Sequence, residues 1–248
     1  MSGTTPQGIT DERQAAAWVR GMFGSIAGRY DLLNHLLSFN LDRLWRAHLI
    51  RRVAPILNNK NAMILDLCCG TGDVMLALEQ RRGAPVIGAD FCHPMLIEAR
   101  KKVAHRTFRS PVFEGDAMQL PVRDASLDLI TVAFGFRNLA NYETGLTELL
   151  RVLKPGGKLA ILEFSTPRSK FFAALYNFFS ATLLPRVGAM ISGSKDAYAY
   201  LPQSIRKFPD APTLAAKMQT AGFAAVEFET MTVGAVALHL GQKPSTKS

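Results

Sequence analysis

The fold is decided by the stretch "NAMILDLCCGTGDV", residues 61–74. Its first half is apolar enough to form a short buried strand, and Gly70 and Gly72 follow before a helical pattern starts at Asp73. Glycine lets backbone N–H groups approach a ligand without a Cβ in the way. In open α/β sheets such a turn lies at the carboxyl end of the strand, where ligands bind. The stretch therefore predicts a ligand-binding loop between a strand and a helix.

The same alternation of short apolar strands and helices continues downstream. Helical patterns over residues 73–82, 93–106 and 142–153 separate the strands, which implies parallel βαβ units. Only a few residues join the last two strands, so these should be antiparallel neighbours. We predict an α/β fold: a Rossmann-like, doubly wound sheet of seven strands, mostly parallel, with a C-terminal antiparallel hairpin and a helical cap. The strands are expected at residues 61–67, 84–90, 110–116, 126–134, 158–164, 224–230 and 234–242.

The chain is predicted to form a single domain over residues 1–248. This length suffices for one well-buried domain with a helical addition. The region before the first strand has helical spacing without strand alternation and is expected to form the cap. The expected parts are an N-terminal helical cap at about 12–58, a cofactor-binding core at 61–165, a helical lid insertion at 166–210, and a closing helix with the strand hairpin at 211–242.

The composition is that of an ordinary globular protein with a basic surplus. Lys and Arg number 29 against 20 Asp and Glu, which gives a net charge of +9 and a pI of about 9.7. Such a charge favours anionic partners, either nucleic acid or a membrane surface with acidic lipids. No nucleic-acid-binding module is recognisable, so no nucleic acid is expected as a partner. The run with Arg43, Arg46, Arg51 and Arg52 could meet anionic lipid or form a solvated helix face.

The three cysteines support neither a disulfide framework nor a zinc site. Cys68 and Cys69 are adjacent, Cys92 is alone, and no Cys/His cluster has the spacing of zinc ligands. We therefore expect no metal. The N-terminal residues 1–14 are polar and lack the apolar core of a signal peptide, which predicts a cytoplasmic protein.

The residues around the glycine loop argue against a dinucleotide. The dinucleotide fingerprint has a third small residue three positions after the second glycine, and that position is Met75 here. Asp66 and Asp73 also bracket the loop with negative charge, which would repel phosphates. Carboxylates at these positions suit a ligand that carries positive charge, such as an ammonium and a sulfonium.

Acidic residues also follow the next two predicted strands. Asp90 could accept hydrogen bonds from both hydroxyls of a ribose, and the adjacent Phe91 offers a ring face for a purine. Asp116 could accept a hydrogen bond from an exocyclic amine. Each carboxylate alone could instead cap a helix or form a turn. Together with Asp66 they occupy the carboxyl ends of three consecutive strands, and this coincidence favours S-adenosylmethionine as the cofactor.

At this point the motifs carry a family resemblance. The stretches "LDLCCGTGD", "GADF", "GDA" and "LRVLKPGGKL" resemble those of class I S-adenosylmethionine-dependent methyltransferases. More narrowly, "GRYDLLN", "FGFRN", "LEFSTP", "YLPQSIRKFP" and "GAVALHLGQKP" resemble the ubiquinone/menaquinone biosynthesis C-methyltransferase family. The match runs over about residues 20–244. Many methyltransferases share the glycine loop, whereas the second set of motifs is much more specific to this family.

The resemblance implies a C-methyltransferase that acts on a ring carbon of a reduced polyprenyl quinol and releases S-adenosylhomocysteine. The substrate would be demethylmenaquinol, 2-polyprenyl-6-methoxy-1,4-benzoquinol or both. The family commonly has Ser before its "FG", and this chain has Ala133, so one polar contact to the cofactor is missing or replaced. The resemblance carries over cofactor contacts for Thr71, Asp90, Asp116 and Ala117. The complete set of expected cofactor-binding residues is Asp66, Gly70, Thr71, Gly72, Asp90, Phe91, Asp116 and Ala117.

A ring carbon becomes nucleophilic when a neighbouring phenol loses its proton, so the site needs a proton acceptor and a group that stabilises phenolate. The stretch "AFGFRNL", residues 133–139, brings Arg137 and Asn138 to the end of the fourth strand. Arg137 is expected to hold the phenolate oxygen or to fix a water that acts as base. Alternatively it pairs with a local carboxylate and only shapes the site. Asn138 could bind a second ring oxygen.

Aromatic residues are expected around the same site. Phe134 and Phe136 would wall the pocket, and Gly135 would let the ring approach. Tyr30, in the predicted cap, could contact the ring, relay a proton or serve only in packing. The expected catalytic residues are Arg137, Asn138 and Tyr30.

The general base stays open at this stage. His93 follows a predicted strand end at a helix start, and His239 lies in the last predicted strand. Either could accept a proton, or each could be an ordinary surface or core histidine. The sequence does not choose between these roles.

The apolar stretch "FFAALYNFFSATLLPRVGAM", residues 171–190, raises the question of a membrane. Asn177 and Pro185 interrupt it, and it is too short for a transmembrane helix. It could be a lid helix that faces the core, or an apolar wall that receives a prenyl tail or enters a bilayer surface. We therefore expect a protein that is cytoplasmic, with peripheral contact at the inner face of the membrane as the alternative.

Three other functions stay open. The chain could methylate another small aromatic substrate, since Ala133 departs from the family pattern. It could be an inactive, cofactor-binding member of a quinone-biosynthesis assembly, although a pure scaffold has no need of "FGFRN". It could also methylate nucleic acid, which would show as steeply salt-dependent binding. The expected partner is a prenylated quinol, and the oligomeric state is open between a monomer, a homodimer and such an assembly.

Overall fold

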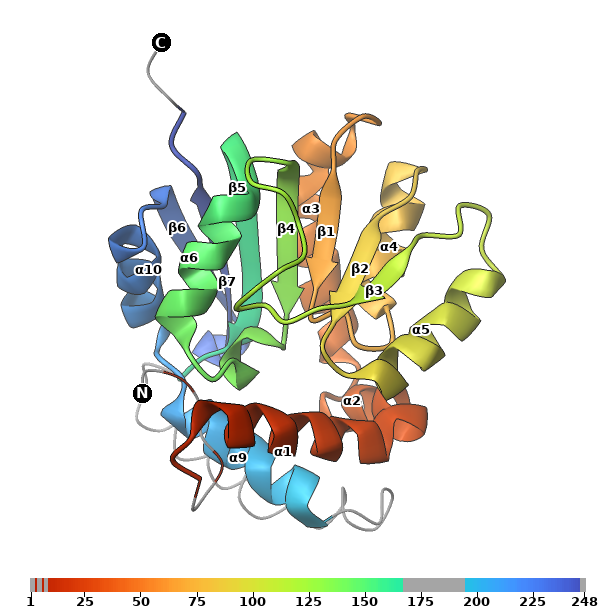
Figure 1. Cartoon of the computed structure of the whole chain (residues 1–248), viewed down its shortest axis with the longest axis vertical. Helices are drawn as coiled ribbons and strands as arrows, with labels where there is room; N and C mark the ends of the chain where they lie inside the picture. Colours follow the sequence, from red (N-terminus) through yellow and green to blue (C-terminus); the bar gives the residue numbers. More distant parts are fainter. Residues whose placement is uncertain (1–2, 4–5, 7–8, 167–194, 246–248) are drawn as a thin grey trace.

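A seven-stranded sheet with helices on both faces forms the body of the protein, and more helices lie across one end of it (Figure 1). The structure is a computed structural model that describes residues 3, 6, 9–166 and 195–245. The apolar stretch 171–190, expected to form part of a lid, lies outside the described residues. The division of the chain into cap, core, lid and closing hairpin stays a prediction.

The strand order is β3–β2–β1–β4–β5–β7–β6. Strands β1 to β5 are parallel, and β7 runs antiparallel to both of its neighbours, β5 and β6. The predicted mostly parallel sheet with a closing antiparallel hairpin is therefore confirmed. The strand bounds are β1 Ile64–Leu67, β2 Ile87–Asp90, β3 Val112–Glu114, β4 Leu127–Ala133, β5 Leu153–Phe164, β6 Ala224–Met231 and β7 Val236–Gln242.

The fifth strand differs from its prediction. It begins at Leu153, ahead of the "KPGG" stretch that was expected to be a separate turn. Leu127 pairs with Leu153 and Leu129 pairs with Lys158, so the register shifts between these two positions. Gly156 has a φ of +81°, which glycine adopts without strain. The turn residues thus form an irregularity within the strand instead of preceding it.

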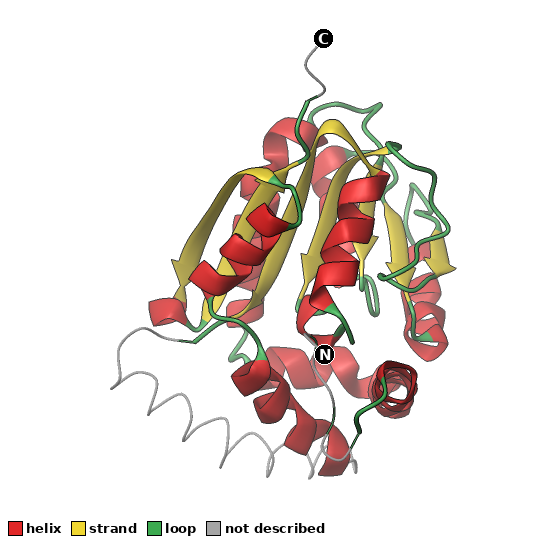
Figure 2. Ribbon diagram, turned by 60° about the vertical axis from the view of Figure 1, so that its left-hand side comes forward, coloured by secondary structure: helices red, strands yellow, loops and turns green. Residues whose placement is uncertain are grey.

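Helices cover both faces of the sheet (Figure 2). One core joins α6 (Tyr142–Val152) and α10 (Ala211–Thr220) to strand residues such as Leu65 and Leu67. The other joins α3 (Leu41–Leu57) and α4 (Asp73–Arg82) to residues such as Ile64. Successive strand residues point to opposite faces, so apolar residues at both alternating positions produce a sheet buried on both sides. Helix α5 (His93–Ala104) packs along β2 and β3.

The cap consists of helices at the carboxyl ends of the parallel strands (Figure 1). It contains α1 (Glu12–Ile26), the short η1 (Ala27–Arg29), α2 (Tyr30–Leu37), the first turns of α3, and α9 (Lys195–Lys207). The rings of Trp18 in α1 and Tyr200 in α9 lie 5.2 Å apart, which joins the two ends of the cap. Within the described part of the chain, none of the helices has the length and apolar character needed to cross a bilayer.

Met75 packs differently from what the sequence suggested. The dinucleotide fingerprint has a small residue at this position of the helix, where it allows close packing on the sheet, yet Met75 is fully buried here. It occupies the space beside Gly88 in β2: a Cβ on Gly88 would lie 2.5 Å from Met75 Sδ. The small residue that allows close approach of α4 to the sheet is therefore Gly88, on the neighbouring strand.

Candidate active site

Two adjoining cavities lie between the cap and the carboxyl ends of the strands. They share four lining residues, Tyr30, Cys68, Gly70 and Phe134. The first cavity extends toward β2 and β3 and the second toward α3, β4 and β5. The shared boundary is therefore formed by the glycine loop, the end of β4 and one cap residue.

The first cavity contains most of the predicted cofactor-binding residues. Its lining includes Gly70, Asp90, Phe91, Asp116 and Ala117. Strand β2 ends at Asp90, as predicted, whereas β3 ends at Glu114, two residues before Asp116. Parallel strands end at the same edge of the sheet, which explains why residues far apart in the sequence meet here.

Asp90 is held rigidly by backbone groups. Its Oδ2 accepts a hydrogen bond from the N–H of Gly70 at 2.8 Å, and its Oδ1 accepts one from the N–H of Cys92 at 2.8 Å. Burial raises the pKa of Asp90 to about 6, although these two bonds favour the charged form. A carboxylate has about four acceptor positions, so Asp90 can still accept hydrogen bonds from a ligand.

Asp66 lies in the second cavity with one oxygen unpaired. Its Oδ1 accepts a hydrogen bond from the Thr131 hydroxyl at 2.6 Å, and its buried Oδ2 has no hydrogen-bond partner among the described residues. Burial raises the pKa of Asp66 to about 7, against the opposing effects of the Thr131 hydroxyl and of the Met75 backbone N–H, which points at the carboxylate without meeting the geometry of a hydrogen bond to Oδ2. A buried acceptor without a partner is costly unless a ligand supplies a donor. The ammonium of S-adenosylmethionine is a donor of this kind, so the unpaired acceptor of Asp66 fits the cofactor.

The second cavity has an aromatic wall and a volume of about 280 Å³. The ring centroids of Phe134 and Phe164 are 5.0 Å apart, and Trp45 lies 5.8 Å from Phe134 and 6.4 Å from Phe164. The indole N–H of Trp45 donates to the Thr232 hydroxyl at 2.8 Å, which fixes the ring. Such a wall suits a planar, apolar group.

Arg137 borders this cavity and is buried in an ion pair. Its Nη1 lies 2.8 Å from Glu163 Oε1 and also donates to the carbonyl of Phe134, while its backbone N–H donates to Glu163 Oε2 at 3.2 Å. Burial alone would lower the pKa of Arg137, but the charge and hydrogen bond of Glu163, together with Tyr30 and Tyr200, outweigh burial and raise that pKa. The guanidinium also lies 5.2 Å from the ring of Phe164. Its Nε has no hydrogen-bond partner among the described residues.

Comparisons with known proteins agree with this arrangement. The model of the ubiE/COQ5 methyltransferase family matches residues 8–243. The chain belongs to the ubiE/COQ5 methyltransferase family. A demethylmenaquinone methyltransferase of Thermus thermophilus is 47% identical over 224 residues, which cover 90% of this chain and all of that one. A ubiquinone/menaquinone biosynthesis C-methyltransferase of Rubrivivax gelatinosus is 40% identical over 235 residues, 94% of this chain and 90% of that one.

The protein is therefore an S-adenosylmethionine-dependent methyltransferase, as the resemblance implied. A solved S-adenosylmethionine-dependent methyltransferase of Thermotoga maritima superimposes with a TM-score of 0.62 at 20% identity, over 90% of this chain and 99% of that one. A methyltransferase solved with the Haloferax volcanii Trm112 activator gives 0.65 at 18% identity, over 90% and 97%. At these identities the similarity concerns the fold, and it confirms the predicted fold class.

For two residues that were predicted to bind the cofactor, the structure shows contacts within the protein, and their role in cofactor binding stays a prediction. A Cβ on Gly72 would meet Met75 Cε at 3.2 Å and Ala99 Cβ at 3.5 Å, and Gly72 lines neither cavity. Its φ of +90° shows that its glycine serves the turn before α4. Thr71 borders the second cavity, but its hydroxyl donates to Asp31 of the cap.

The residues of the "FGFRN" motif are divided between the two cavities. Arg137 borders the second cavity, whereas Asn138 borders the first and accepts a hydrogen bond from the Tyr200 hydroxyl at 3.2 Å. Gly135 was expected to admit the substrate ring; it lines the first cavity, and a Cβ there would lie 2.3 Å from the Cβ of Cys68, so its small size also makes room for that side chain. Phe136 is fully buried and lines neither cavity, because it packs in the core beside Tyr142 at 5.6 Å.

Neither candidate histidine borders a cavity. His93 is exposed and its Nδ1 lies 3.0 Å from Glu114 Oε2. His239 is buried against Phe228, and its Nε2 lies 2.9 Å from the carbonyl of Ala211. Burial lowers the pKa of His239 below its ordinary value. Both positions fit the ordinary roles that the sequence left open.

Several site residues could not be found from sequence alone. Trp45 and Phe164 form the aromatic wall, Glu163 pairs with Arg137, and Arg20 places its guanidinium 5.5 Å from the ring of Phe91. The family-specific "LEFSTP" motif contained a signal for Glu163 and Phe164, since these residues end the fifth strand. Among the described residues, no group of three or more His, Cys, Asp or Glu side chains could hold a metal.

Proposed function

We propose that the protein methylates a ring carbon of a reduced polyprenyl quinol in menaquinone or ubiquinone biosynthesis. The observation that carries this proposal is the aromatic second cavity, which adjoins the first and contains Arg137. The names of the relatives support the quinol class, since they include demethylmenaquinone methyltransferases and UbiE C-methyltransferases. The candidate substrates are demethylmenaquinol and 2-polyprenyl-6-methoxy-1,4-benzoquinol.

The first cavity would hold the adenosine part of the cofactor. Asp90 would accept hydrogen bonds from the ribose, and Phe91, Asp116 and Ala117 would surround the purine. Asp66 would face the ammonium through its unpaired Oδ2. When bound, S-adenosylmethionine supplies an electrophilic methyl group, and S-adenosylhomocysteine is what it leaves.

The second cavity would hold the quinol ring and orient it. Trp45, Phe134 and Phe164 supply flat apolar surfaces, and Arg137 supplies positive charge at the edge of the ring. A phenol beside a guanidinium gives up its proton more readily, because the charge stabilises the phenolate. Burial raises the pKa of Tyr30, so its hydroxyl stays protonated and acts as a hydrogen-bond donor. No metal takes part in this proposal.

The setting in the cell follows from the substrate. A polyprenyl quinol resides in a bilayer, so a cytoplasmic enzyme must reach it at the inner face of the membrane. The net charge of +9 supports peripheral contact with acidic lipids. A homodimer or a quinone-biosynthesis assembly is compatible with this arrangement and would be detected by light scattering of the purified protein.

The proposal is tested with purified protein, S-adenosylmethionine and each of the two demethylquinols kept reduced. We expect a product heavier by one methyl group, located on a ring carbon by tandem mass spectrometry. Cells that lack the protein should accumulate the corresponding demethylquinone. Turnover of a different aromatic compound, with none of either quinol, would favour the alternative small-molecule substrate.

An inactive, cofactor-binding role makes a separate prediction. Calorimetry would then detect S-adenosylmethionine binding, while both quinols gave no methylated product. Deletion cells would lose quinone, and the double variant Arg137→Gln/Glu163→Gln, which leaves no buried charge alone, would restore it as well as the wild type does. Restoration by the wild type alone would exclude this role.

A further inference from the structure

The cap helix α2 carries Tyr30, which lines both cavities and packs 6.0 Å from the ring of Phe23, but the leucines of α2 add little apolar attachment. Among its leucines with described side chains, only Leu33 is buried, whereas Leu32 and Leu36 are 61% and 45% exposed. Burial of one leucine contributes about 1.5–3 kcal/mol and does not by itself define the orientation of a helix. Polar contacts must therefore contribute much of what places α2 on the core.

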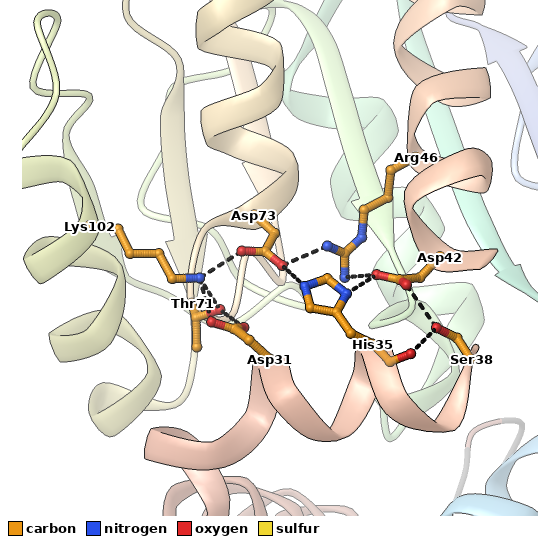
Figure 3. A network of polar contacts seen from close by, with 8 residues as sticks. All are labelled: Asp31, His35, Ser38, Asp42, Arg46, Thr71, Asp73 and Lys102. Atoms are coloured by element: carbon orange, nitrogen blue, oxygen red, sulfur yellow. Dashed lines mark hydrogen bonds and ion pairs between the residues drawn. The ribbon is translucent and has the colours of Figure 1, made fainter. Parts of the chain in front are cut away.

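Such contacts form a continuous network between the cap and the cofactor-binding elements (Figure 3). Two of its members come from α2, one from the residue that follows α2 and two from α3, while the others come from the glycine loop, α4 and α5. We call it the cap network. It consists of Asp31, His35, Ser38, Asp42, Arg46, Thr71, Asp73 and Lys102.

Lys102, in the last turn of α5, joins three elements within this network. Its Nζ lies 2.6 Å from Asp31 Oδ2 in α2, 2.6 Å from Asp73 Oδ1 in α4, and 3.0 Å from Thr71 Oγ1 in the glycine loop. An ammonium has three N–H donors, so these three acceptors use all of them. The Thr71 hydroxyl in turn donates to Asp31. The cap and the glycine loop are thus joined in two ways. Lys102 contacts both Asp31 and Thr71, and Thr71 also donates directly to Asp31.

Arg46 and His35 connect the third carboxylate, that of Asp42, to the network. Arg46 Nη1 lies 2.6 Å from Asp73 Oδ2, and its Nη2 lies 3.3 Å from Asp42 Oδ2. His35 Nδ1 lies 2.8 Å from the same oxygen of Asp42. The network therefore sets three carboxylates against two permanent cations. Without the charge of Lys102, the carboxylates of Asp31 and Asp73 would face each other across the boundary between cap and core and repel.

We propose that Lys102 is a positioning residue of the methyltransferase. It ties α2 to the glycine loop through Asp31 and Thr71, and thereby holds Tyr30 over both cavities. Lys102 itself lines neither cavity, so it acts through its partners. In consequence the glycine loop, which borders the cofactor, also sets the position of the cap. Only the turnover measurement depends on the proposed function, because it uses the quinol as substrate.

The test is Lys102→Met, with Lys101→Met as the matched control. Lys101 is its neighbour on α5, and its ammonium pairs with Glu98 of the same helix at 2.7 Å. The two tryptophans of the chain, Trp18 and Trp45, both lie in cap helices, so quenching of their fluorescence by acrylamide reports on the cap. We expect Lys102→Met to increase quenching and to lower kcat/KM for the quinol about tenfold, mainly through KM. Lys101→Met should match the wild type.

Two further variants keep the test decisive. Asp31→Asn removes the partner charge without changing shape and should reproduce both effects, and its effect should not multiply with that of Lys102→Met. Lys102→Arg should restore kcat/KM to within about threefold, because the cation is retained. Wild-type quenching in both Lys102→Met and Asp31→Asn would overturn the proposal. Acrylamide quenching needs no substrate, so this measurement tests the position of the cap even if neither quinol is turned over.

Discussion

At the scale of single residues, the site depends on carboxylates that the fold keeps away from water. Asp66 is buried at the end of β1 with one oxygen bonded to Thr131 and the other unpaired. Burial raises its pKa to about 7 because the charged form has lost its hydration. A cationic ligand would restore the missing partner and lower that pKa again. Binding and ionisation of Asp66 should therefore be linked.

This linkage predicts that cofactor affinity depends on pH. Below the pKa of about 7 most Asp66 is protonated, and the proton must leave before an ammonium can pair with the carboxylate. The Kd for S-adenosylmethionine should be about tenfold weaker at pH 6 than at pH 8. Calorimetry at both values measures the change, and Asp66→Asn should bind weakly at both. An equal Kd at pH 6 and 8 for the wild type would contradict the assignment.

In the ligand-free protein, ionisation of Asp66 at high pH lowers the free energy of unfolding, whereas it favours cofactor binding. A carboxyl group whose pKa is raised on folding contributes stability at low pH, and this contribution is lost as pH rises from about 4 to 7. Asp66→Asn should therefore be more stable than the wild type at pH 8 without ligand, while binding the cofactor more weakly. Urea unfolding at pH 8 provides this control. A less stable variant would indicate that the carboxylate is paired within the protein.

Arg137 illustrates why a single substitution at a buried ion pair is ambiguous. Its side chain is only 5% exposed, and its partner Glu163 is 1% exposed. Removing one partner leaves the other charge buried and uncompensated, at a cost of about 3–5 kcal/mol. Loss of turnover in Arg137→Ala would therefore mix an effect on folding with an effect on chemistry.

Neutralising both partners separates the two effects. Arg137→Ala should lower the free energy of unfolding by about 3–5 kcal/mol, and Arg137→Gln combined with Glu163→Gln should recover most of that loss, because no buried charge is left alone. Quinol turnover should stay at least about a hundredfold below wild type in the double variant. Urea unfolding and product analysis measure the two quantities. Recovery of wild-type turnover would remove the guanidinium from the mechanism.

At the scale of elements, close packing of α4 on the sheet positions the glycine loop. Met75 in α4 fills the space above Gly88 in β2, and both are buried beneath the loop that precedes the helix. Close-packed interiors tolerate added volume poorly. The dinucleotide pattern has a small residue on the helix at the position of Met75. Here the helix residue is large, and the small residue, Gly88, lies on the strand.

Gly88→Ala should therefore be destabilising. The added Cβ would lie 2.5 Å from Met75 Sδ, 3.0 Å from Val112 Cγ1 and 3.1 Å from Cys69 Sγ. We expect a loss of about 1–3 kcal/mol in urea unfolding. Gly21→Ala is the control, since a Cβ there meets nothing within 4 Å and alanine favours the helix, so its stability should equal or exceed wild type. Equal stability of Gly88→Ala and wild type would show that Met75 moves aside freely.

At the scale of the whole molecule, the two cavities lie between the cap and the sheet. Tyr30 comes from the cap and Phe134 from the sheet, and both border each cavity. A ligand that fills either cavity contacts both parts and binds only when they are together. Binding should consequently stabilise the entire fold.

S-adenosylmethionine should raise the Tm of the protein. At a concentration 100 times Kd the stabilisation is about 2.7 kcal/mol, which corresponds to about 5–11 °C for a domain of this size. At the same ligand concentration Asp90→Ala should show a smaller shift. Asp124→Ala, at an exposed carboxylate outside both cavities, should keep the full shift. Differential scanning calorimetry measures all three, and an unchanged Tm in the wild type would argue against the site.

Most of the fold could be predicted because its signals are local. The change from helical spacing to short apolar strands, the glycine loop after β1 and the short connection before β7 each lie within a few residues. Asp90 and Asp116 could be placed at the first cavity for the same reason, since parallel strands end at one edge. By contrast, the inclusion of "KPGG" in β5 could not be predicted, because the pairs on either side of it, Leu153 with Leu127 and Lys158 with Leu129, join residues far apart in the sequence.

The sequence by itself therefore determined the α/β class, the mostly parallel sheet with a closing antiparallel hairpin, and the family. Only the tertiary structure decided which side chains meet: that Arg137 pairs with Glu163, that Trp45 joins Phe164, and that the Thr71 hydroxyl binds Asp31. Local pattern follows from backbone geometry and periodicity, which the chain carries at every residue. The pairing of side chains 26 to over 100 residues apart depends instead on how cap and sheet pack together, which no short stretch encodes.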